Sequence, residues 1–584
     1  MIKLLKLYSV PNIFDPIEFH EGVNLVIGEK VEERYVVTRK DRKTNGVGKS
    51  MCIEFINYCL LKQSSDSRVT KIPLDIVSAD TVINLDLIVG TTQLTIRRSV
   101  GDSEKPTIIN NNGNQNTFNN VDDANKYLTK LLYEDVEIKQ SAIRPSFRQL
   151  IGPLIRDEDS EFKDVIHCYD LNRRIPASEL IKPHLFFFDV DLMIIDRIKE
   201  VFAEMDKKTI FVNKLKRDLT VNKTRKLSEV KAEANAINSD LQKINGALES
   251  FKTNEAYESI QNDLAQIETE LNTLRSEQAA LKFQIRRIDL LPGLEEVRLK
   301  DIELIYNQFR EGLGDIVGKS LTQVVDFKKK ISEFQATLLN EKVKEMRARL
   351  DEVTEQVRML EDKVSEKMRV IDKKGVLKDF KNAVAVYNQK NNEFFRLQGR
   401  LDDYEKAVRE QNQLKLQRDE YFSQLDAELF KINATVKSFN DTIIVIHEYI
   451  MGSASASFGL NLSRTKDIIE VDYRIDDDGS HSVDRTKVFI YDLALILNHY
   501  TSKRHPKFLI HDNIFDVDQD TLVQSINYAY EQESRHNFQY ILTLNRDKIE
   551  NEERKKQIKM GINEHVIARF TRQSKFLKKD YREI

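Results

Sequence analysis

The sequence predicts two regions of mixed α/β structure separated by a long antiparallel coiled coil. Three observations support this fold class. A glycine-rich loop lies between a strand and a helix near the N-terminus, apolar heptad repeats dominate the middle, and an apolar strand ending in aspartate lies near the C-terminus. We therefore divide the 584 residues into an N-terminal lobe (1–191), a coiled coil (192–449) and a C-terminal lobe (450–584).

Composition limits the classes of protein to consider. Hydrophobic residues make up 40% and charged residues 32%, with no Trp and 10 Pro, which favours long solvated helices. A net charge of −3 gives no general attraction to nucleic acid, so any DNA site must be local. The three cysteines include no CxxC pair, which excludes a disulfide framework and a cysteine zinc site.

This cysteine usage fits a reducing compartment, and we expect a cytoplasmic protein. No apolar run reaches the ~18 residues of a membrane span. The N-terminal residues 1–16 alternate as a strand does and do not resemble a signal peptide.

The glycine-rich loop has the parts of a P-loop. An apolar strand over 23–27 ends in Gly28, and a helix is predicted over 51–61. The loop residues before that helix are Asn45, Gly46, Val47, Gly48, Lys49 and Ser50. In a P-loop the glycines turn backbone N–H groups toward phosphates, Lys49 reaches the β- and γ-phosphates, and the Ser50 hydroxyl binds Mg²⁺. Lys43 replaces the first motif glycine, so we interpret residues 29–43 as a polar insertion; the alternative is a chance Gly-Lys-Ser in a surface turn.

The remaining elements follow from alternation and helical periodicity. In the N-terminal lobe we predict strands over 2–9, 17–20, 81–89, 92–99 and 107–110 and a helix over 121–132, with Ser146 to Leu154 following it. In the C-terminal lobe we predict strands over 458–462, 468–475, 507–511 and 539–544 and helices over 486–500 and 522–533.

Apolar residues in the middle region repeat with 4-3 spacing, which is typical of a coiled coil. The first arm carries the series Ile237 to Phe251, Ile260 to Leu274 and Leu281 to Ile288, and the second carries Val343 to Val364 and Phe394 to Val408. A glycine cluster over 312–318 predicts the tip of an antiparallel hairpin. Seam breaks at 252–259 and 372–380 are about equally far from that tip, which predicts an elbow where they face each other.

The strand Phe508 to Asp512 has the pattern of a Walker B motif, in which the aspartate binds Mg²⁺ opposite Ser50. Buried strands also end in Asp at ordinary turns. Here the motif supplies the acidic partner that the N-terminal lobe lacks, so we predict a Mg·ATP site shared by both lobes.

The order of these parts resembles that of the SMC and double-strand-break-repair ATPases over the whole chain. Finer features are similar to a bacterial branch labelled as a domain of unknown function and to the SMC-like subunits of Lamassu-type antiphage defence systems. These features are the loop with its upstream insertion, Asp478-Gly479-Ser480, His511-Asp512-Asn513 and the region 306–334. The resemblance implies an ABC-type ATPase head built from N- and C-terminal lobes, with a coiled-coil insertion.

The family also implies that two heads enclose two ATP molecules as a homodimer, with a signature Ser-Gly-Gly loop from one head touching the γ-phosphate held by the other. The matching loop here lacks Gly-Gly, and Ser480, then Ser482, are the candidates for this contact; the alternative is a polar turn that caps a helix. The Q-loop glutamine matches Gln149, with Gln140 as rival, and either could be an ordinary surface glutamine.

The catalytic glutamate that normally follows the Walker B aspartate is replaced by Asn513, which cannot accept a proton at neutral pH. We therefore expect slow hydrolysis, or substitution by Asp516 or Asp518. The family's switch histidine is also missing, and Asn545 is the nearest residue. His511 is interpreted as a packed histidine rather than a catalyst.

Basic residues gather at the base of the first arm, where DNA lies in the related ATPases. They are Lys207, Lys208, Lys214, Lys216, Arg217, Lys223, Arg225 and Lys226. Such residues would give steeply salt-dependent DNA binding, although a solvated helix face is the alternative. The tip lacks the CxxC of a zinc hook, and could pair through its apolar residues or dock a partner.

The sequence is compatible with three functions. The first is a DNA-sensing ATPase that dimerises on ATP and controls a companion effector, a nuclease, in defence against phages and plasmids. The second is a DNA-repair or chromosome-organisation ATPase, and the third is a structural scaffold with a vestigial nucleotide site. The sequence carries no nuclease constellation of its own beyond the acidic residues assigned to Mg²⁺.

Overall fold

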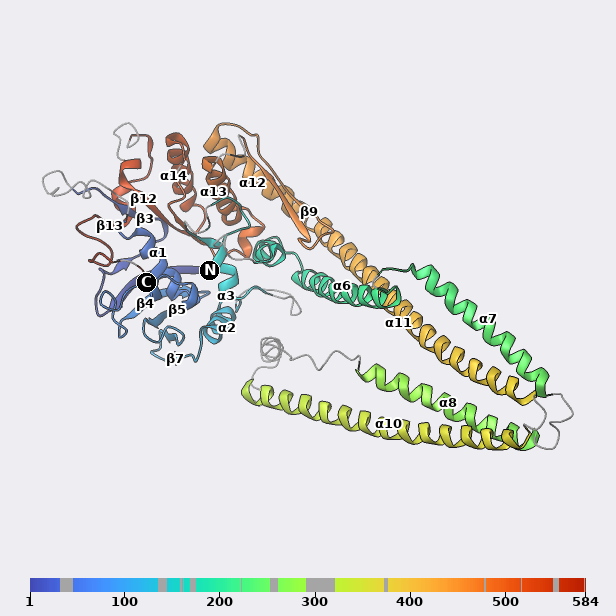
Figure 1. The fold of residues 1–584 in the computed structure, drawn as a ribbon. Helices are drawn as coiled ribbons and strands as arrows, with labels where there is room; N and C mark the ends of the chain where they lie inside the picture. Colours follow the sequence, from blue (N-terminus) through green and yellow to red (C-terminus); the bar gives the residue numbers. More distant parts are fainter. Residues whose placement is uncertain are drawn as a thin grey trace. The chain divides into compact units, whose positions relative to one another are not determined.

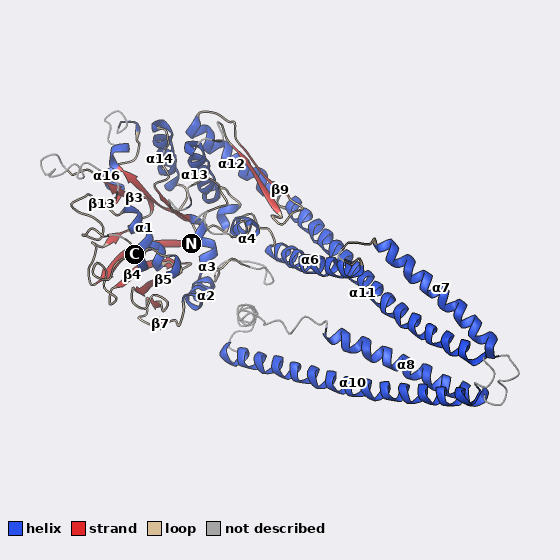
Figure 2. Ribbon diagram, viewed as in Figure 1, coloured by secondary structure: helices blue, strands red, loops and turns tan. Residues whose placement is uncertain are grey.

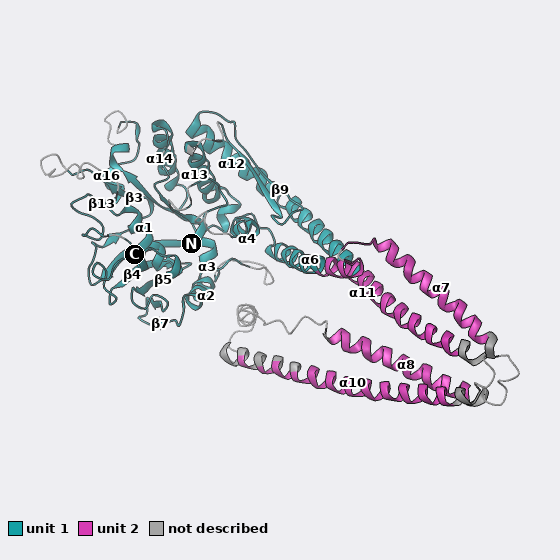
Figure 3. Ribbon diagram, viewed as in Figure 1, with its two compact units in different colours: residues 1–210, 409–584 teal, residues 211–408 magenta. Residues whose placement is uncertain are grey.

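The computed structural model describes residues 1–31, 46–134, 144–157, 160, 162–168, 175–221, 223–252, 261–289, 321–371, 376–476, 479, 481–515, 517–549, 556–581 and 583. These residues form two compact units (Figure 3). The first, here called the head, comprises Met1–Ile210 and Arg409–Ile584; the second, the arm, comprises Phe211–Val408. The head therefore also contains residues 192–210 and 409–449, which lie in the coiled coil when the chain is divided into the predicted lobes 1–191 and 450–584.

The head contains an antiparallel sheet built from N-terminal residues (Figures 1 and 2). Its strand order is β2-β1-β4-β5-β6-β7. The strands are β1 (Ile2–Val10), β2 (Ile17–Glu18), β4 (Val82–Val89), β5 (Thr92–Ser99), β6 (Thr107–Asn110) and β7 (Gln115–Thr117). Alternate residues of β1 and β4 are buried, as the alternation in the sequence predicts for a sheet with one face in the core. All five predicted N-lobe strands outside the P-loop are confirmed, whereas β7 was not predicted.

The second sheet of the head is parallel and joins the two ends of the chain. Its order is β13-β3-β12-β11-β8, and every neighbouring pair is parallel. The strands are β3 (Gly22–Gly28), β8 (Ile155–Arg156), β11 (Phe508–Asp512), β12 (Gln539–Asn545) and β13 (Val566–Phe570). Every residue of β3, β11 and β12 is buried, which explains their continuous apolar sequences. The β-hairpin β9 (Ser457–Leu462) and β10 (Ile469–Arg474) forms a separate two-stranded sheet.

Helices pack on these sheets and share one hydrophobic core with them. In the described part of the head, the helices outside the coiled coil are α1 (Lys49–Cys59), α2 (Val121–Leu132), α3 (Phe147–Ile151), α4 (Ala177–Leu180), α5 (Lys182–Phe187), α12 (Asn433–Met451), α13 (His481–Leu497), α14 (Gln519–Glu533) and α16 (Ile562–His565). Short 3₁₀ turns cover Ser64–Asp66, Val69–Lys71, Gly152–Leu154, Thr501–Lys503 and Arg546–Lys548. The predicted start of the helix at Thr486 is wrong, because α13 already begins at His481.

Long helices form the predicted coiled coil. They are α6 (Leu192–Leu219), α7 (Leu227–Lys252), α8 (Gln261–Asp289), α10 (Leu321–Ile371) and α11 (Val376–Lys431). Ion pairs between helices show that the two halves of the hairpin run antiparallel, because the residue number of one partner rises while that of the other falls. These pairs are Lys208 with Glu410 in the head, and Lys231 with Glu405, Asp240 with Lys390 and Arg275 with Glu361 in the arm.

The predicted heptad positions form the seam of the arm. Leu271, Val353 and Val357 are buried together, with Ile267, Leu274, Leu281, Leu360 and Val364 packed against them. A second cluster joins Leu219, Val230, Ala234 and Leu401 to Leu397 and Tyr404. The coiled-coil part of the predicted fold class is therefore confirmed.

The predicted elbow and tip lie largely outside the described residues. Helix α7 ends at Lys252 and α8 begins at Gln261, while α10 ends at Ile371 and α11 begins at Val376; the residues between each pair are outside the described part of the chain. Residues from all four helices meet in one apolar cluster: Leu248 and Leu264, with Ile244, Val364, Ala383, Val384 and Tyr387. Residues 312–318, the predicted tip, are not described, and the elbow stays a prediction.

Within the described part of the chain, no helix combines the length and apolar character that crossing a membrane requires.

Candidate nucleotide-binding site

Three parallel strands end side by side at one edge of the second sheet. Gly28 at the end of β3 lies opposite Asn545 at the end of β12, and Thr543 of β12 lies opposite Asp512 at the end of β11. The carboxyl ends of parallel strands are where α/β folds place their ligands. The sheet therefore brings the predicted P-loop strand and the predicted Walker B strand to the same edge, with one strand between them.

The backbone of the P-loop explains its glycines. Gly46 has φ 70° and Gly48 has φ 106°, a region that is unfavourable for residues with a side chain. Gly48 precedes α1, and its carbonyl accepts the first helical hydrogen bond from the N–H of Cys52 at 2.9 Å. The loop thus delivers Lys49 and Ser50 at the N-terminus of a buried helix, where backbone N–H groups and the helix dipole favour an anion.

Lys49 contacts a residue of the C-terminal lobe. Its Nζ donates to Oδ1 of Asn545 at 2.6 Å, and both side chains are buried. From the sequence, Asn545 is only the residue nearest to a missing histidine, and its contact with Lys49 was not predicted. Asn545 ends a strand adjacent to β3, so the amide can hold the lysine ammonium without adding a charge.

Asp512 is buried and lies next to helix α1. The Thr543 hydroxyl donates to its Oδ1 at 2.5 Å and accepts from the backbone N–H of Asn513 at 2.9 Å. Burial raises the pKa of the Cys52 thiol, and the negative charge of Asp512 adds to that effect. The carboxylate at the end of β11 is thus close enough to the P-loop helix to act on it electrostatically.

Asn513 has φ 62°, a conformation that Asn adopts more readily than most residues. Its carbonyl accepts from Nη1 of Arg485 on α13 at 2.7 Å. The position after Asp512 is therefore fixed by contacts with both β12 and α13.

The donor set suits a magnesium ion that arrives with a nucleotide. Mg²⁺ is commonly held by one or two protein oxygens together with phosphate oxygens and waters. The Ser50 hydroxyl and the Asp512 carboxylate fit that role. Among the described residues, no cluster of three or more His, Cys, Asp or Glu could bind a metal by itself.

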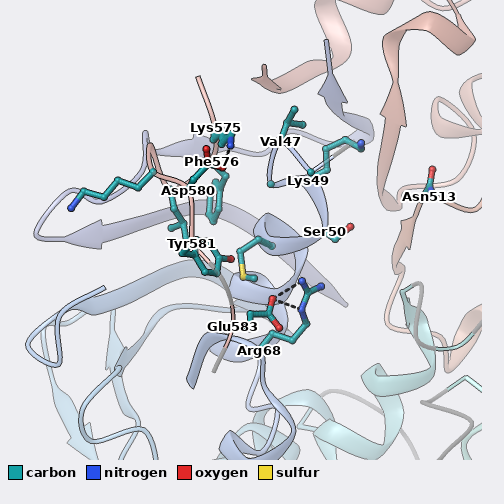
Figure 4. Close-up of a pocket in the computed structure, with 15 residues that line it drawn as sticks. Val47, Lys49, Ser50, Arg68, Asn513, Lys575, Phe576, Asp580, Tyr581 and Glu583 are labelled. Atoms are coloured by element: carbon teal, nitrogen blue, oxygen red, sulfur yellow. Dashed lines mark hydrogen bonds and ion pairs between the residues drawn. The ribbon is translucent and has the colours of Figure 1, made fainter. Parts of the chain in front are cut away.

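A cavity of about 680 Å³ opens beside the P-loop (Figure 4). One part of its wall consists of residues 46–51 with Arg68 and Asn513. The other part comes from residues that follow β13, which we call the tail segment (571–581), and from Glu583. Its lining residues are Lys575, Phe576, Leu577, Lys579, Asp580, Tyr581 and Glu583. This wall was not predicted from the sequence. The tail segment carries no motif, and it lies beside the P-loop because the strand before it, β13, pairs with the P-loop strand β3.

The remaining candidates for nucleotide contact do not line this cavity or lie outside the described residues. Gln149 is exposed at the start of α3, where its Oε1 accepts from the N–H of Ser146 at 2.9 Å in a capping box. It does not line the cavity, and its role as a Q-loop glutamine stays a prediction. Ser482 is the second residue of α13. Asn45, Gln140, Ser480 and Asp516 lie outside the described residues, and Asp518 is the N-cap residue of α14.

His511 is a packed histidine, as interpreted from the sequence. It is fully buried, with Nε2 at 3.0 Å from Oδ2 of Asp492 and Nδ1 at 3.1 Å from the hydroxyl of Tyr540. Asp492 on α13 also accepts two hydrogen bonds from Arg156 on β8, at 2.5 and 2.7 Å. Burial acts to raise the pKa of Asp492, but the Arg156 charge and the hydrogen bonds from His511 and Arg156 outweigh it and lower that pKa.

The basic residues at the base of the first arm are mostly exposed. The exposed ones are Lys207, Lys214, Lys216, Arg217, Lys223 and Lys226. Lys208 pairs with Glu410 at 2.6 Å, and Arg225 pairs with Glu233. Lys223 follows α6 with φ 72°, in the turn that leads to α7. DNA binding by these residues stays a prediction.

Comparison with protein families gives two matches. Residues 12–278 match the family described as an AAA domain, and residues 446–580 match the family described as "Uncharacterised protein conserved in bacteria (DUF2326)". The chain is 22% identical over 556 residues to the "Uncharacterized protein YydD" of Bacillus subtilis (strain 168), with 90% of each chain covered. The AAA match includes the P-loop, and the second match includes Asp512.

Among solved structures the chain is similar to two archaeal Smc heads. One is the Smc head domain with a coiled coil and joint from Pyrococcus yayanosii, at 12% identity, covering 96% of this chain and 94% of that one, with a TM-score of 0.33. The other is the Smc head domain with an extended coiled coil bound to the C-terminal domain of ScpA from Pyrococcus furiosus, at 12% identity, covering 96% and 92%, with a TM-score of 0.32.

Proposed function

We propose that this chain, whose residues 12–278 match an AAA domain, is an SMC-like ATPase of the ABC type that binds Mg·ATP at the shared edge of its parallel sheet, and that ATP closes two heads into a dimer. The observation that supports the proposal is the contact of Lys49 with Asn545, at the sheet edge where the strand of Asp512 also ends. Lys49 contacts Asn545 at 2.6 Å, although 496 residues separate them in the sequence.

Each residue has a role that follows from its chemistry. Backbone N–H groups of 46–50 and the Lys49 ammonium bind the β- and γ-phosphates. Ser50 and Asp512 hold the Mg²⁺ that neutralises phosphate charge. Asn513 orients water but cannot accept its proton, so that hydrolysis is slow and bound ATP acts mainly as a clamp. Asp516 is the candidate for a substitute base.

Closure of the dimer needs a contact from the second head. The loop before α13, with Ser480 and Ser482, supplies it in this proposal, because Ser hydroxyls and a helix N-terminus both bind phosphate oxygens. The α13 side chain of Arg485 bonds to the carbonyl of Asn513, which connects this helix to the residue next to Asp512 within one head.

DNA is the proposed ligand of the exposed basic residues on α6 and in the turn after it. Replacing Lys214, Lys216 and Arg217 by Glu should weaken binding to duplex DNA and flatten its salt dependence, because fewer counterions are released. ATP affinity should not change. Replacing Lys342 and Lys344, exposed lysines on α10, serves as the control; equal loss in both variants would mean that DNA binds elsewhere.

We propose that the closed, DNA-bound dimer controls a companion effector, a nuclease, in a Lamassu-type antiphage defence system. The proposal rests on the resemblance of the chain to such SMC-like subunits. Co-expression with the product of an adjacent effector gene, followed by a phage plating assay, separates defence from a role in DNA repair or chromosome organisation.

The central test is nucleotide-dependent dimerisation. Light scattering coupled to gel filtration should show a dimer of the full chain with Mg·ATP and a monomer without it or with Lys49→Ala. Asp512→Asn should also prevent the ATP-dependent form. A protein that neither binds Mg·ATP nor changes its mass would instead be a scaffold with a vestigial site.

A further inference from the structure

The tail segment is fixed to the P-loop at its centre. The N–H of Phe576 donates to the carbonyl of Val47 at 3.1 Å, and the Phe576 ring is 2% exposed. That ring packs against Phe14, Phe55 and Phe570, with centroids 4.6, 5.1 and 5.5 Å away. A Cβ on Gly48 would lie 2.6 Å from the Cβ of Phe576. This part of the chain is therefore a built wall of the P-loop.

The far end of the same wall is attached to helix α1 through a buried carboxylate. Glu54 accepts from the Ser67 hydroxyl at 2.7 Å and from the backbone N–H of Arg68 at 2.9 Å. Arg68 in turn donates to Oε1 of Glu583 through Nε at 2.9 Å and Nη2 at 2.6 Å. Phe576 and Glu583 are thus both attached beside the cavity, and Tyr581 lies between the two attachments in the sequence (Figure 4).

Among the described residues that line the cavity, two are aromatic, Phe576 and Tyr581. The Phe576 ring is buried among three other phenylalanines, whereas Tyr581 is only partly buried. Burial, and then the charge of Glu583, raise the pKa of Tyr581 to about 12, so its ring carries no charge at physiological pH. A cavity of about 680 Å³ is within the ~300–1,000 Å³ usual for small-molecule sites.

We infer that the tail segment completes the nucleotide site and that Tyr581 stacks on the base of the bound nucleoside triphosphate. The inference rests on the proposed function, because the P-loop must hold the phosphates for the base to extend along this wall. Aromatic rings stack on any base through its π-face, and such contacts strengthen binding without direct hydrogen bonds. Residues at the two ends of the chain then bind opposite ends of one ligand.

The test compares a ligand that has a base with one that lacks it. In the full chain, Tyr581→Ala should weaken Mg·ATP binding about tenfold, the scale of one lost aromatic stack, and leave the affinity for Mg·tripolyphosphate unchanged. Tyr581→Phe keeps the ring and should retain ATP affinity. Tyr500→Ala, which removes an exposed tyrosine elsewhere on the head, is the control and should bind both ligands like the wild type.

Two outcomes would overturn the inference: an unchanged ATP affinity in Tyr581→Ala, or an equal loss for ATP and tripolyphosphate. Failure of the proposed function looks different, since the wild type itself would then bind neither ligand in a Lys49-dependent way. If Tyr581→Ala does not fold, photolabelling of the wild type with 8-azido-ATP decides. The peptide containing Tyr581 should carry the label, and labelling confined to other peptides would refute the stacking contact.

Discussion

Asn513 combines an unusual residue with an unusual backbone conformation. Its φ of 62° is accessible to Asn and Asp but is strained for Glu, the residue normally found at this position in related heads. The backbone N–H and carbonyl are both engaged, by Thr543 and Arg485. The sequence predicts that a carboxylate is missing here, and the positive φ of the structure favours Asp over Glu at this position.

We predict that Asn513→Asp accelerates ATP hydrolysis at least about tenfold, because a positioned carboxylate can accept the proton of the attacking water. The affinity for Mg·ATP should stay the same, since the P-loop contacts are untouched. Steady-state phosphate release and nucleotide binding measure the two quantities. The same change in a Lys49→Ala background provides the control and should give no activity. Unchanged turnover in Asn513→Asp would show that the missing base is not what limits the rate.

We predict that Gly48→Ala destabilises the head more than Gly452→Ala does. Both glycines have positive φ, 106° and 74°, so each substitution incurs the left-handed strain of about 1–2 kcal/mol. Only at Gly48 does the new methyl group also meet the Cβ of Phe576, at 2.6 Å, whereas nothing lies within 4 Å at Gly452. Thermal unfolding gives the comparison, and equal losses would mean that the tail segment moves away at little energetic cost.

Local motifs were enough to predict the strongest candidate site residues but not their neighbours. Lys49 and Asp512 follow from short patterns whose chemistry fixes their spacing. Asn545 and Thr543 carry no such pattern: their roles come from the pairing of β12 with β3 and β11, a contact between distant parts of the chain. Tyr581 was not predicted either, because it also carries no motif and lies far from the P-loop in the sequence.

At the scale of elements, one buried polar network connects the sheet to the helix that follows the predicted signature loop. Arg156 on β8, Asp492 on α13 and His511 on β11 form it, and all three side chains are at most 1% exposed. Breaking a buried ion pair by removing one partner typically costs about 3–5 kcal/mol, because the remaining charge is unpaired. The network therefore fixes the position of α13 relative to β11, the strand that carries Asp512. Sequence analysis did not predict it, since β8 has two residues and leaves no periodic signal.

We predict that the head loses stability as the pH falls below about 6.5. Burial, followed by the charge of Arg156, lowers the pKa of His184 on α5 to about 3. The unfolded chain binds a proton near pH 6.5 while the folded head does not, so the stability present above pH 6.5 declines toward pH 3. The loss is about 1.4 kcal/mol per pH unit for one such histidine.

Chemical unfolding at pH 7.5 and 5.5 measures this dependence. His184→Gln should reduce the difference between the two pH values, although the variant also loses the contact with the Tyr491 hydroxyl, 3.0 Å from Nδ1. His499→Gln, at an exposed position, should leave the difference as in the wild type. If His184→Gln keeps the full pH dependence, other groups cause it.

At the scale of the whole molecule, the coiled coil was the part best predicted from sequence. Heptad spacing is a local property repeated over many turns, and the predicted seam residues Leu271, Val353 and Val357 are buried together. The domain boundaries were harder, because α6 and α11 continue without a break from the head into the arm. A helix that crosses a boundary gives no change of periodicity for a sequence pattern to detect.

The division into two units predicts that damage to the arm spares the nucleotide site. Val353 of α10 is fully buried in the seam with α8, so Val353→Asp places a charge among apolar side chains and should unpair these helices. Met359→Asp, on the same helix but 56% exposed, should leave them paired. Limited proteolysis should therefore cleave α8 and α10 faster in the first variant only, while both variants bind Mg·ATP with wild-type affinity. A loss of ATP binding in Val353→Asp alone would mean that the head depends on an intact arm to assemble its shared site.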